Sequence, residues 1–240
     1  MRGALLPEDH AFADGPVFDR VTTLDGAREA LAAWDPLIAE QYAPFLMELW
    51  RRFDASAVVG EGVKLGLGAR LVNLGESDDV RIEGPAAIRG ILRAEAGGRI
   101  RIGRFVYVGD HALISARKSI DIGDATLLAH GVQIFDNNSH PIQVYQREVQ
   151  FRRMLGDKGV RVPMEIAAAE VHIGRNCWVG MNSLVMKGVT IGSASIVAAA
   201  SVITSDVPSG VVVAGNPGRQ VRELTESELA ASDTREIVSN

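Results

Sequence analysis

Apolar side chains recur at every sixth residue along much of this chain, a period that fits neither a helix nor a flat strand. A helix needs apolar residues every three to four positions, and a half-buried strand needs them every two. A chain that turns a corner after each six residues stacks these side chains inside a prism. The longest unbroken run consists of Ile173, Val179, Val185, Ile191, Val197 and Ile203. We therefore predict an all-β solenoid built from parallel coils.

Two other positions of each hexad are also restricted. The fifth is small or β-branched, as Cys177, Ser183, Val189, Ser195, Ser201 and Val207. The second is Gly174, Gly180, Gly192, Ala198 and Thr204, interrupted by Met186. Shorter runs upstream share the period: Val59, Leu65 and Leu71; Ile82 and Ile88; Ile102, Val108 and Ile114; Ile122, Leu128 and Ile134. Since Cys177 occupies one of the small inward positions, we interpret it as core packing and not as a nucleophile.

The two ends of the chain lack the hexad and are expected to close the solenoid, because stacked repeats need capped ends. Residues 24–53 carry apolar residues three and four apart, which predicts helices divided at Pro36 and Pro44. Near the other end, 225–228 read Thr-Glu-Ser-Glu, a capping-box signature for a short helix. Residues 209–221 should be an extended connection.

The sequence thus predicts three parts: an N-terminal helical cap over 1–57, a β-helix over 58–208 with an excursion loop at 135–170, and a C-terminal extension and helix over 209–240. A net charge of −5 argues against a general nucleic-acid binder. No apolar run reaches the ~18–20 residues of a membrane span, and the N-terminus lacks the order of a secretory signal. The single cysteine allows no intrachain disulfide. We expect a cytoplasmic protein.

Candidate chemistry lies in the long excursion, because function tends to reside where a tight scaffold loops out. It opens with residues 136–141, in which His140 precedes a proline. A histidine among hydrogen-bonding side chains is a candidate general base, and Asp136, Asn138 or a backbone carbonyl could orient its ring. Further along, 147–161 contains Arg147, Arg152, Arg153, Lys158 and Arg161 against Glu148 and Asp157. This excess of cations would either meet an anionic ligand or form a solvated face, and the sequence leaves both open.

These residues resemble a known family. The resemblance covers 100–222 and rests on 122–124, the His140-Pro141 pair, 171–180, 187–192, 201–208 and 213–217. The chain resembles the hexapeptide-repeat acyltransferases of the left-handed parallel β-helix type, and within them the maltose, galactoside and nodulation-type sugar O-acetyltransferases. The length of the excursion resembles that of acetyltransferases from surface-polysaccharide biosynthesis.

The resemblance implies a left-handed coil, acetyl-CoA as co-substrate, a sugar or glycan acceptor, and a homotrimer with its sites between subunits. It implies that His140 deprotonates a sugar hydroxyl and that Trp178 lies beside the active site. The residues matching the pantetheine site are Met181, Ala199, Ser201, Thr204 and Ser205, and those matching the nucleotide end are Arg219 and Arg222. Family members often hold the acceptor with an asparagine where this chain has Asp110 and His111. Either one of these residues substitutes for the asparagine, or the acceptor differs.

No serine or cysteine shows a base-paired arrangement in the sequence, so we expect direct transfer without an acyl-enzyme. Three alternatives remain. The acceptor could be an amine on an amino or nucleotide sugar. A γ-carbonic-anhydrase-like metal hydratase shares the prism, yet the chain lacks its pair of histidines about five apart, and we expect no metal site. Lastly, a prism can serve as a non-catalytic scaffold.

Overall fold

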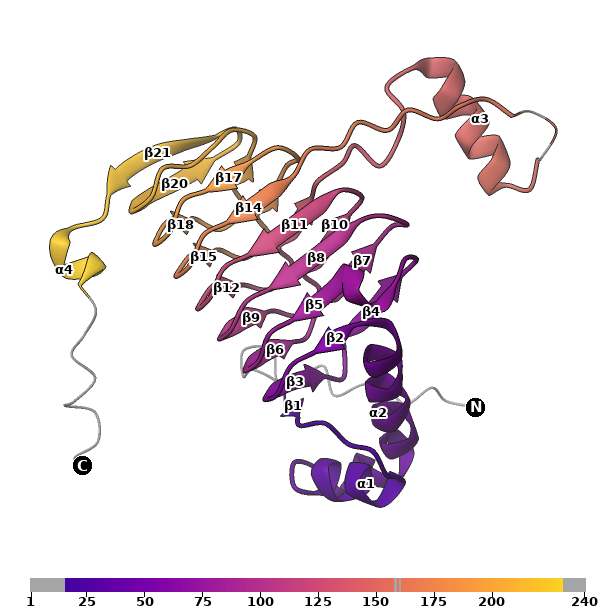
Figure 1. Cartoon of the computed structure of the whole chain (residues 1–240). Helices are drawn as coiled ribbons and strands as arrows, with labels where there is room; N and C mark the ends of the chain where they lie inside the picture. Colours follow the sequence, from indigo (N-terminus) through magenta and orange to yellow (C-terminus); the bar gives the residue numbers. More distant parts are fainter. Residues whose placement is uncertain (1–15, 158, 160, 231–240) are drawn as a thin grey trace.

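A computed structural model describes residues 16–157, 159 and 161–230 and shows a parallel β-solenoid with three faces (Figure 1). Each coil runs from face 1 to face 2 to face 3, and we name the corners by the faces they join. Face 1 contains β2 (Val58–Val59), β5 (Val80–Ile82), β8 (Arg99–Ile102), β11 (Ser119–Ile122), β14 (Val171–Ile173) and β17 (Thr190–Ile191). The predicted fold class, a left-handed parallel β-helix of hexapeptide repeats, is confirmed.

The other two faces follow the same order. Face 2 contains β3 (Val63–Gly66), β6 (Ala86–Ile88), β9 (Val106–Val108), β12 (Leu127–Leu128), β15 (Trp178–Val179), β18 (Ile196–Val197) and β20 (Val211–Gly215). Face 3 contains β4 (Arg70–Asn73), β7 (Ile91–Ala94), β10 (Leu113–Ala116), β13 (Gln133–Phe135), β16 (Leu184–Val185) and β19 (Val202–Ile203). Neighbouring strands within these sets pair in parallel, so residues at matching positions of successive coils lie side by side.

The hexad pattern reflects the interior of this prism. The aliphatic residues of the long run, from Ile173 to Ile203, are at most 3% exposed. The small second position has a steric cause: a Cβ on Gly174 would lie 2.6 Å from the backbone nitrogen of Ser193 in the next coil. At the fifth position, the Ser183 hydroxyl donates to the carbonyl of Ala198 at 3.0 Å, one coil further on. Side chains that are small and able to donate thus satisfy backbone groups inside the corners.

Helices cover the first coil. Helix α1 (Leu24–Ala32) and helix α2 (Pro36–Ser56) lie at one end of the prism, with α1 crosswise to α2 (Figure 1), and α2 packs against β2 and β4. Strand β1 (Val17–Phe18) pairs antiparallel with β3, and η1 (Ser77–Asp79) is a short 3-10 turn between β4 and β5. Pro36 does begin a helix, but Pro44 lies inside α2 and does not divide it. The helix continues because Trp50 and Phe53, beyond the proline, are fully buried.

The far end differs from the predicted extended connection. Strand β20 turns back into β21 (Gly218–Glu223), and the two pair antiparallel at the edge of face 2. The predicted capping box forms: Thr225 accepts from the backbone of Glu228 and the Glu228 side chain accepts from Thr225, which starts α4 (Glu226–Leu229). This hairpin ends the parallel sheet of face 2.

The excursion leaves the prism at the corner between faces 3 and 1. Strand β13 ends at Phe135 and β14 begins at Val171, and between them helix α3 (Val144–Met154) stands away from the prism (Figure 1). At its base the Ala169 N–H donates to the carbonyl of Asp136 at 2.8 Å, so the two ends of the excursion are joined. The division of the chain into a cap, a β-helix and a C-terminal extension at 57/58 and 208/209 stays a prediction.

Candidate active site

His140 is exposed and is held by the excursion itself. Its Nδ1 lies 2.8 Å from Oε1 of Gln150 on α3. The ring stacks on Phe151, with 5.4 Å between centroids and 26° between planes. The backbone N–H of His140 donates to the carbonyl of Asn138. Within the described part of the chain, no contact occupies Nε2, which leaves one ring nitrogen available for chemistry.

The structure does not give Asp136 or Asn138 the orienting role expected from the sequence. Asp136 is fully buried, and its carboxylate accepts from the backbone N–H groups of Arg117 and Lys118 at 2.8 and 2.6 Å. Asn138 bonds through its backbone, its N–H donating to the carbonyl of Ala167 at 3.0 Å. Both residues therefore shape the base of the excursion, while the contact with the imidazole comes from Gln150. Sequence proximity had suggested Asp136, and only the fold of α3 brings Gln150 close.

Asp110 and His111, the candidate acceptor residues, lie at the corner between faces 2 and 3. The Asp110 carboxylate accepts from Nε and Nη2 of the buried Arg89, at 3.0 and 2.5 Å. Its backbone N–H donates to Nδ1 of His130 at 3.1 Å. His111 is exposed and has a left-handed backbone, with φ of 58°. Asp110 thus already has a structural partner, whereas His111 faces solvent.

Trp178 lies on the outer surface of face 2 and is 52% exposed. Trp178 pairs with Leu127 on the preceding coil and with Ile196 on the following coil. Leu127 in turn pairs with Tyr107, one coil earlier. We call this set, Tyr107, Leu127, Trp178 and Ile196, the apolar ladder. Leu127 and Trp178 are exposed, and Tyr107 and Ile196 are half-buried on either side of them.

The residues predicted to bind pantetheine occupy two different corners. Met181 and Ala199 are exposed at the corner between faces 2 and 3, and Thr204 and Ser205 are exposed at the corner between faces 3 and 1. Ser201 is fully buried, and its hydroxyl accepts from the N–H of Gly215 at 3.1 Å. A direct contact of Ser201 with a ligand is therefore wrong for this structure, because the side chain points into the prism.

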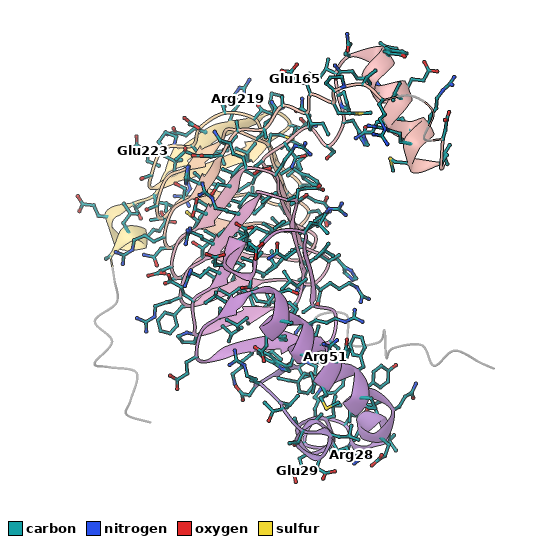
Figure 2. The ribbon with its side chains drawn as sticks, turned by 45° about the vertical axis from the view of Figure 1, so that its right-hand side comes forward. Arg28, Glu29, Arg51, Glu165, Arg219 and Glu223 are labelled. Atoms are coloured by element: carbon teal, nitrogen blue, oxygen red, sulfur yellow. The ribbon has the colours of Figure 1, made fainter. Side chains whose placement is uncertain are left out.

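Arg219 and Arg222 lie on β21, at the opposite end of the prism from Arg51 of α2 (Figure 2). Arg219 is exposed, and its guanidinium donates to the carbonyl of Gly218 at 2.9 Å. Arg222 instead forms a bidentate ion pair with Glu228, with both N–O distances at 2.8 Å. Among the described residues, Arg219 therefore has no acidic partner, whereas Arg222 has one.

Two of the described cations of the excursion, Arg147 and Arg152, have partners within it. Arg147 donates to the carbonyls of Pro141 and Ile142 at 3.1 and 2.8 Å. Arg152 pairs with Glu148 at 2.8 Å and lies 3.9 Å from Asp157. Lys158 lies outside the described residues. Arg153 and Arg161 are exposed, so both alternatives for this segment, a solvated face and an anion site, stay predictions.

Sequence reasoning did not anticipate a groove of about 490 Å³ along face 1. Arg81, Arg101, Asp121, His172 and Thr190 line it, and neither His140 nor Trp178 does. Its floor consists of corner glycines that the stacking of coils requires, so the groove follows from the repeat itself. The residues that the structure describes contain no group of three or more His, Cys, Asp or Glu side chains suited to a metal ion. Of the helices described, none has both the length and the apolar content needed to cross a membrane.

Comparison with known proteins supports the resemblance seen in the sequence. Residues 170–205 match the family described as bacterial transferase hexapeptide (six repeats). The galactoside O-acetyltransferase of Escherichia coli is 31% identical over 132 residues, which cover 55% of this chain and 58% of that protein. The match therefore spans less than two thirds of that relative's length.

Two solved structures share the fold. A mutant of AntD, an N-acyltransferase from Bacillus cereus in complex with dTDP and coenzyme A, superposes with a TM-score of 0.59 at 14% identity, covering 75% of this chain and 91% of that one. The polySia-specific acetyltransferase NeuO gives a TM-score of 0.54 at 24% identity, covering 75% of this chain and 86% of that one. At these identities the two likenesses show the fold alone. The predicted resemblance is confirmed: residues 170–205 match the hexapeptide-repeat transferase family, and the chain is similar to a sugar O-acetyltransferase.

Proposed function

We propose that the protein is an acetyltransferase that moves an acetyl group from acetyl-CoA to a sugar hydroxyl, with His140 as the general base. The observation that carries the proposal is the state of the His140 ring. One nitrogen is fixed by Gln150 at 2.8 Å and the other is uncontacted within the described residues, on an exposed excursion. A base needs this combination of a fixed ring and an accessible lone pair.

The chemistry follows from the weakness of an alcohol as a nucleophile at neutral pH. Nε2 of His140 would remove the hydroxyl proton as the oxygen attacks the thioester carbon. The tetrahedral intermediate would then collapse, breaking the carbon–sulfur bond, and the imidazolium would return its proton to the coenzyme A thiolate. No acyl-enzyme is required, in keeping with the burial of Cys177 and Ser201.

The negative charge on the thioester oxygen needs a donor. In the turn after Trp178, the N–H of Gly180 donates to Val197 and that of Asn182 donates to His130. The N–H of Met181, between them, has no partner among the described residues. We assign this group as the candidate donor for the oxyanion.

Within a single chain, the proposed base and the proposed coenzyme-binding residues lie on different parts of the prism. This separation supports an oligomer in which one subunit completes the site of another. Trp178 and Met181 lie on and beside face 2, whereas His140 projects from the corner between faces 3 and 1. Helix α3 and its flanks expose a set of large apolar side chains: Ile142, Val144, Tyr145, Met154 and Leu155. A second copy that places its apolar ladder against this excursion would cover both surfaces and bring Trp178 to His140. We therefore propose a homotrimer with sites between subunits.

The nature of the acceptor is the open part of the proposal. An amine on an amino or nucleotide sugar is the second candidate. An uncharged amine is a better nucleophile than an alcohol and depends less on a base. The two candidates therefore differ in how strongly turnover needs His140.

An acceptor screen tests the proposal. The purified chain would be incubated with acetyl-CoA and pairs of sugars that differ only in carrying a hydroxyl or an amino group at one carbon. Thiol release and mass spectrometry of the product would identify the acetylated atom. Acetylation of hydroxyl members alone supports the proposal, acetylation of amino members selects the alternative, and release with neither would exclude sugar acetyl transfer for this panel.

A further inference from the structure

We infer that Gln150 is a positioning residue that fixes the tautomer and orientation of His140. This inference rests on the proposed function of His140 as a base, and it assigns a role to a residue of α3 that the sequence did not single out.

The first step concerns the orientation of the Gln150 amide. Its Nε2 donates to the carbonyl of Ser139 at 3.3 Å, which determines which end of the amide faces the ring. The other end, Oε1, then lies 2.8 Å from Nδ1 of His140. An amide oxygen can only accept a hydrogen bond. The hydrogen-bond network therefore assigns the proton to Nδ1 and leaves the lone pair on Nε2, the nitrogen without a contact.

The second step concerns the carbonyl that anchors the amide. Ser139 has a left-handed backbone with φ of 60°, and its N–H donates to Oδ1 of Asn137 at 2.8 Å. Asn137 is itself buried and bonds to Asp136 and Ser115. The anchor is thereby tied to the prism, so the position of the Gln150 amide is determined from outside α3 as well as from within it.

The third step concerns the plane of the ring. Phe151, the next residue on α3, stacks on the imidazole. One turn earlier, Arg147 holds the carbonyls of Pro141 and Ile142, which follow His140 in the chain. Arg147 is the charged residue of α3 that contacts residues 141 and 142. No described carboxylate contacts the His140 ring. Helix α3 thus holds the His140 ring through Gln150 and Phe151, and it holds the two residues after His140 through Arg147.

A neutral partner suits a base. A carboxylate facing Nδ1 would stabilise the imidazolium and keep the ring protonated to higher pH. A glutamine fixes the same tautomer without adding charge, so the ring stays able to accept a proton from an alcohol.

The test uses the full chain with Gln150→Leu, which removes the acceptor, and Gln150→Glu, which keeps it. The matched control is Gln143→Leu at the start of α3, whose side chain makes no capping hydrogen bond. Long-range nitrogen–proton NMR reports the His140 tautomer without any acceptor present. Turnover of acetyl-CoA with methyl galactoside as the probe is measured in parallel.

We expect Nδ1–H in the wild type, in Gln143→Leu and in Gln150→Glu, and a shift towards Nε2–H in Gln150→Leu. With Gln150→Leu, kcat should fall at least about tenfold, with KM for acetyl-CoA unchanged, since a wrong tautomer removes the base. In Gln150→Glu, the acidic limb of the rate profile should move up by about one pH unit. If Gln150→Leu loses α3, the test uses Gln150→Asn in its place. This variant keeps the amide but shortens the side chain by one methylene.

An unchanged tautomer in Gln150→Leu overturns the inference, whatever the role of His140. Full activity of His140→Ala, by contrast, overturns the proposed base and is seen in the turnover measurement alone. The two failures are therefore distinguishable.

Discussion

Arg222 and Glu228 form a bidentate ion pair that joins β21 to the short helix α4. The pair, together with a hydrogen bond from the Thr225 backbone, lowers the pKa of Glu228 from its ordinary value of 4.5 to about 2. A carboxylate whose pKa falls on folding stabilises the folded state above its unfolded pKa. That contribution is lost as pH falls from 4.5 through about 2.

We predict that α4 loses its amide protection across this acidic window while the β-helix keeps its own. Both partners are exposed, so the effect should be local. Hydrogen exchange of 226–229 at decreasing pH measures it. In Glu228→Gln the protection should be low at every pH, and equal protection of the wild type at neutral pH and at pH about 2 would contradict the prediction.

The interior of the corners gives a second prediction. The Cys177 thiol donates to the carbonyl of Gly192 at 3.3 Å. The Ser183 hydroxyl, at the same position of the following hexad, donates to the carbonyl of Ala198 in the same way. Cys177→Ser should therefore change the free energy of unfolding by under about 1 kcal/mol. Cys177→Leu, which overpacks the corner, should cost about 1–3 kcal/mol. Chemical denaturation compares the two, and an equal cost would show that the site is not close-packed.

Burial raises the pKa of the Cys177 thiol, chiefly through desolvation. The native protein should accordingly resist iodoacetamide at neutral pH and react after unfolding. Rapid alkylation of the native chain would contradict the assignment of Cys177 to the core.

The success of the sequence in predicting the fold has a physical cause. A six-residue period follows directly from stacking, so Val179 and Val185 could be assigned to the interior from spacing alone, and both are fully buried. Elements whose structure depends on packing or pairing with another part of the chain were less predictable. The pairing of β21 with β20 needs a free sheet edge, and Pro44 remains helical because Trp50 and Phe53, further along α2, are fully buried.

The candidate site was predicted in part, for the same reason. The hexad rule placed Ser201 inside the prism, while the resemblance placed it at a ligand, and the structure follows the hexad rule. His140 could be proposed from the sequence because proline and polar neighbours surround it there, and its role stays a prediction. Gln150 could not be found this way, since its contact with His140 depends on how α3 folds back over the excursion.

The third prediction concerns the base. His140→Ala should lower acetyl transfer by at least about 10²-fold, the usual contribution of a positioned base, with little change in acetyl-CoA affinity. Steady-state turnover and calorimetric titration measure the two quantities. His172→Ala, another exposed outward-facing histidine, is the matched control. Turnover of the His140 variant within a few-fold of wild type would rule out its role.

The fourth prediction concerns assembly. Light scattering at micromolar concentration should show a trimer, because α3 and the apolar ladder each expose large apolar side chains. Leu155→Glu should weaken the trimer, since Leu155 is 88% exposed in the single chain and lies at the end of α3. Leu37→Glu is the matched control, because Leu37 is 92% exposed on α2. A monomeric wild type, or equal effects of the two changes, would contradict the proposed interface.

The last prediction concerns the phosphates of coenzyme A. A cationic group near them must offset the net negative charge of the protein, and the two arginines of β21 differ in their freedom to do so. Arg219 donates within its own turn, whereas Arg222 is committed to Glu228. Arg219→Glu should therefore weaken acetyl-CoA binding more than Arg222→Glu, whose main effect should be loss of α4.

A further variant separates the two roles. Glu228→Gln releases Arg222 from its charged partner while leaving the arginine in place. Unchanged calorimetric affinity for acetyl-CoA in this variant is expected if Arg222 only holds α4, whereas tighter binding would show that Arg222 can reach a phosphate. If Arg219→Glu folds and binds acetyl-CoA as tightly as wild type, the phosphate contacts lie elsewhere on the chain.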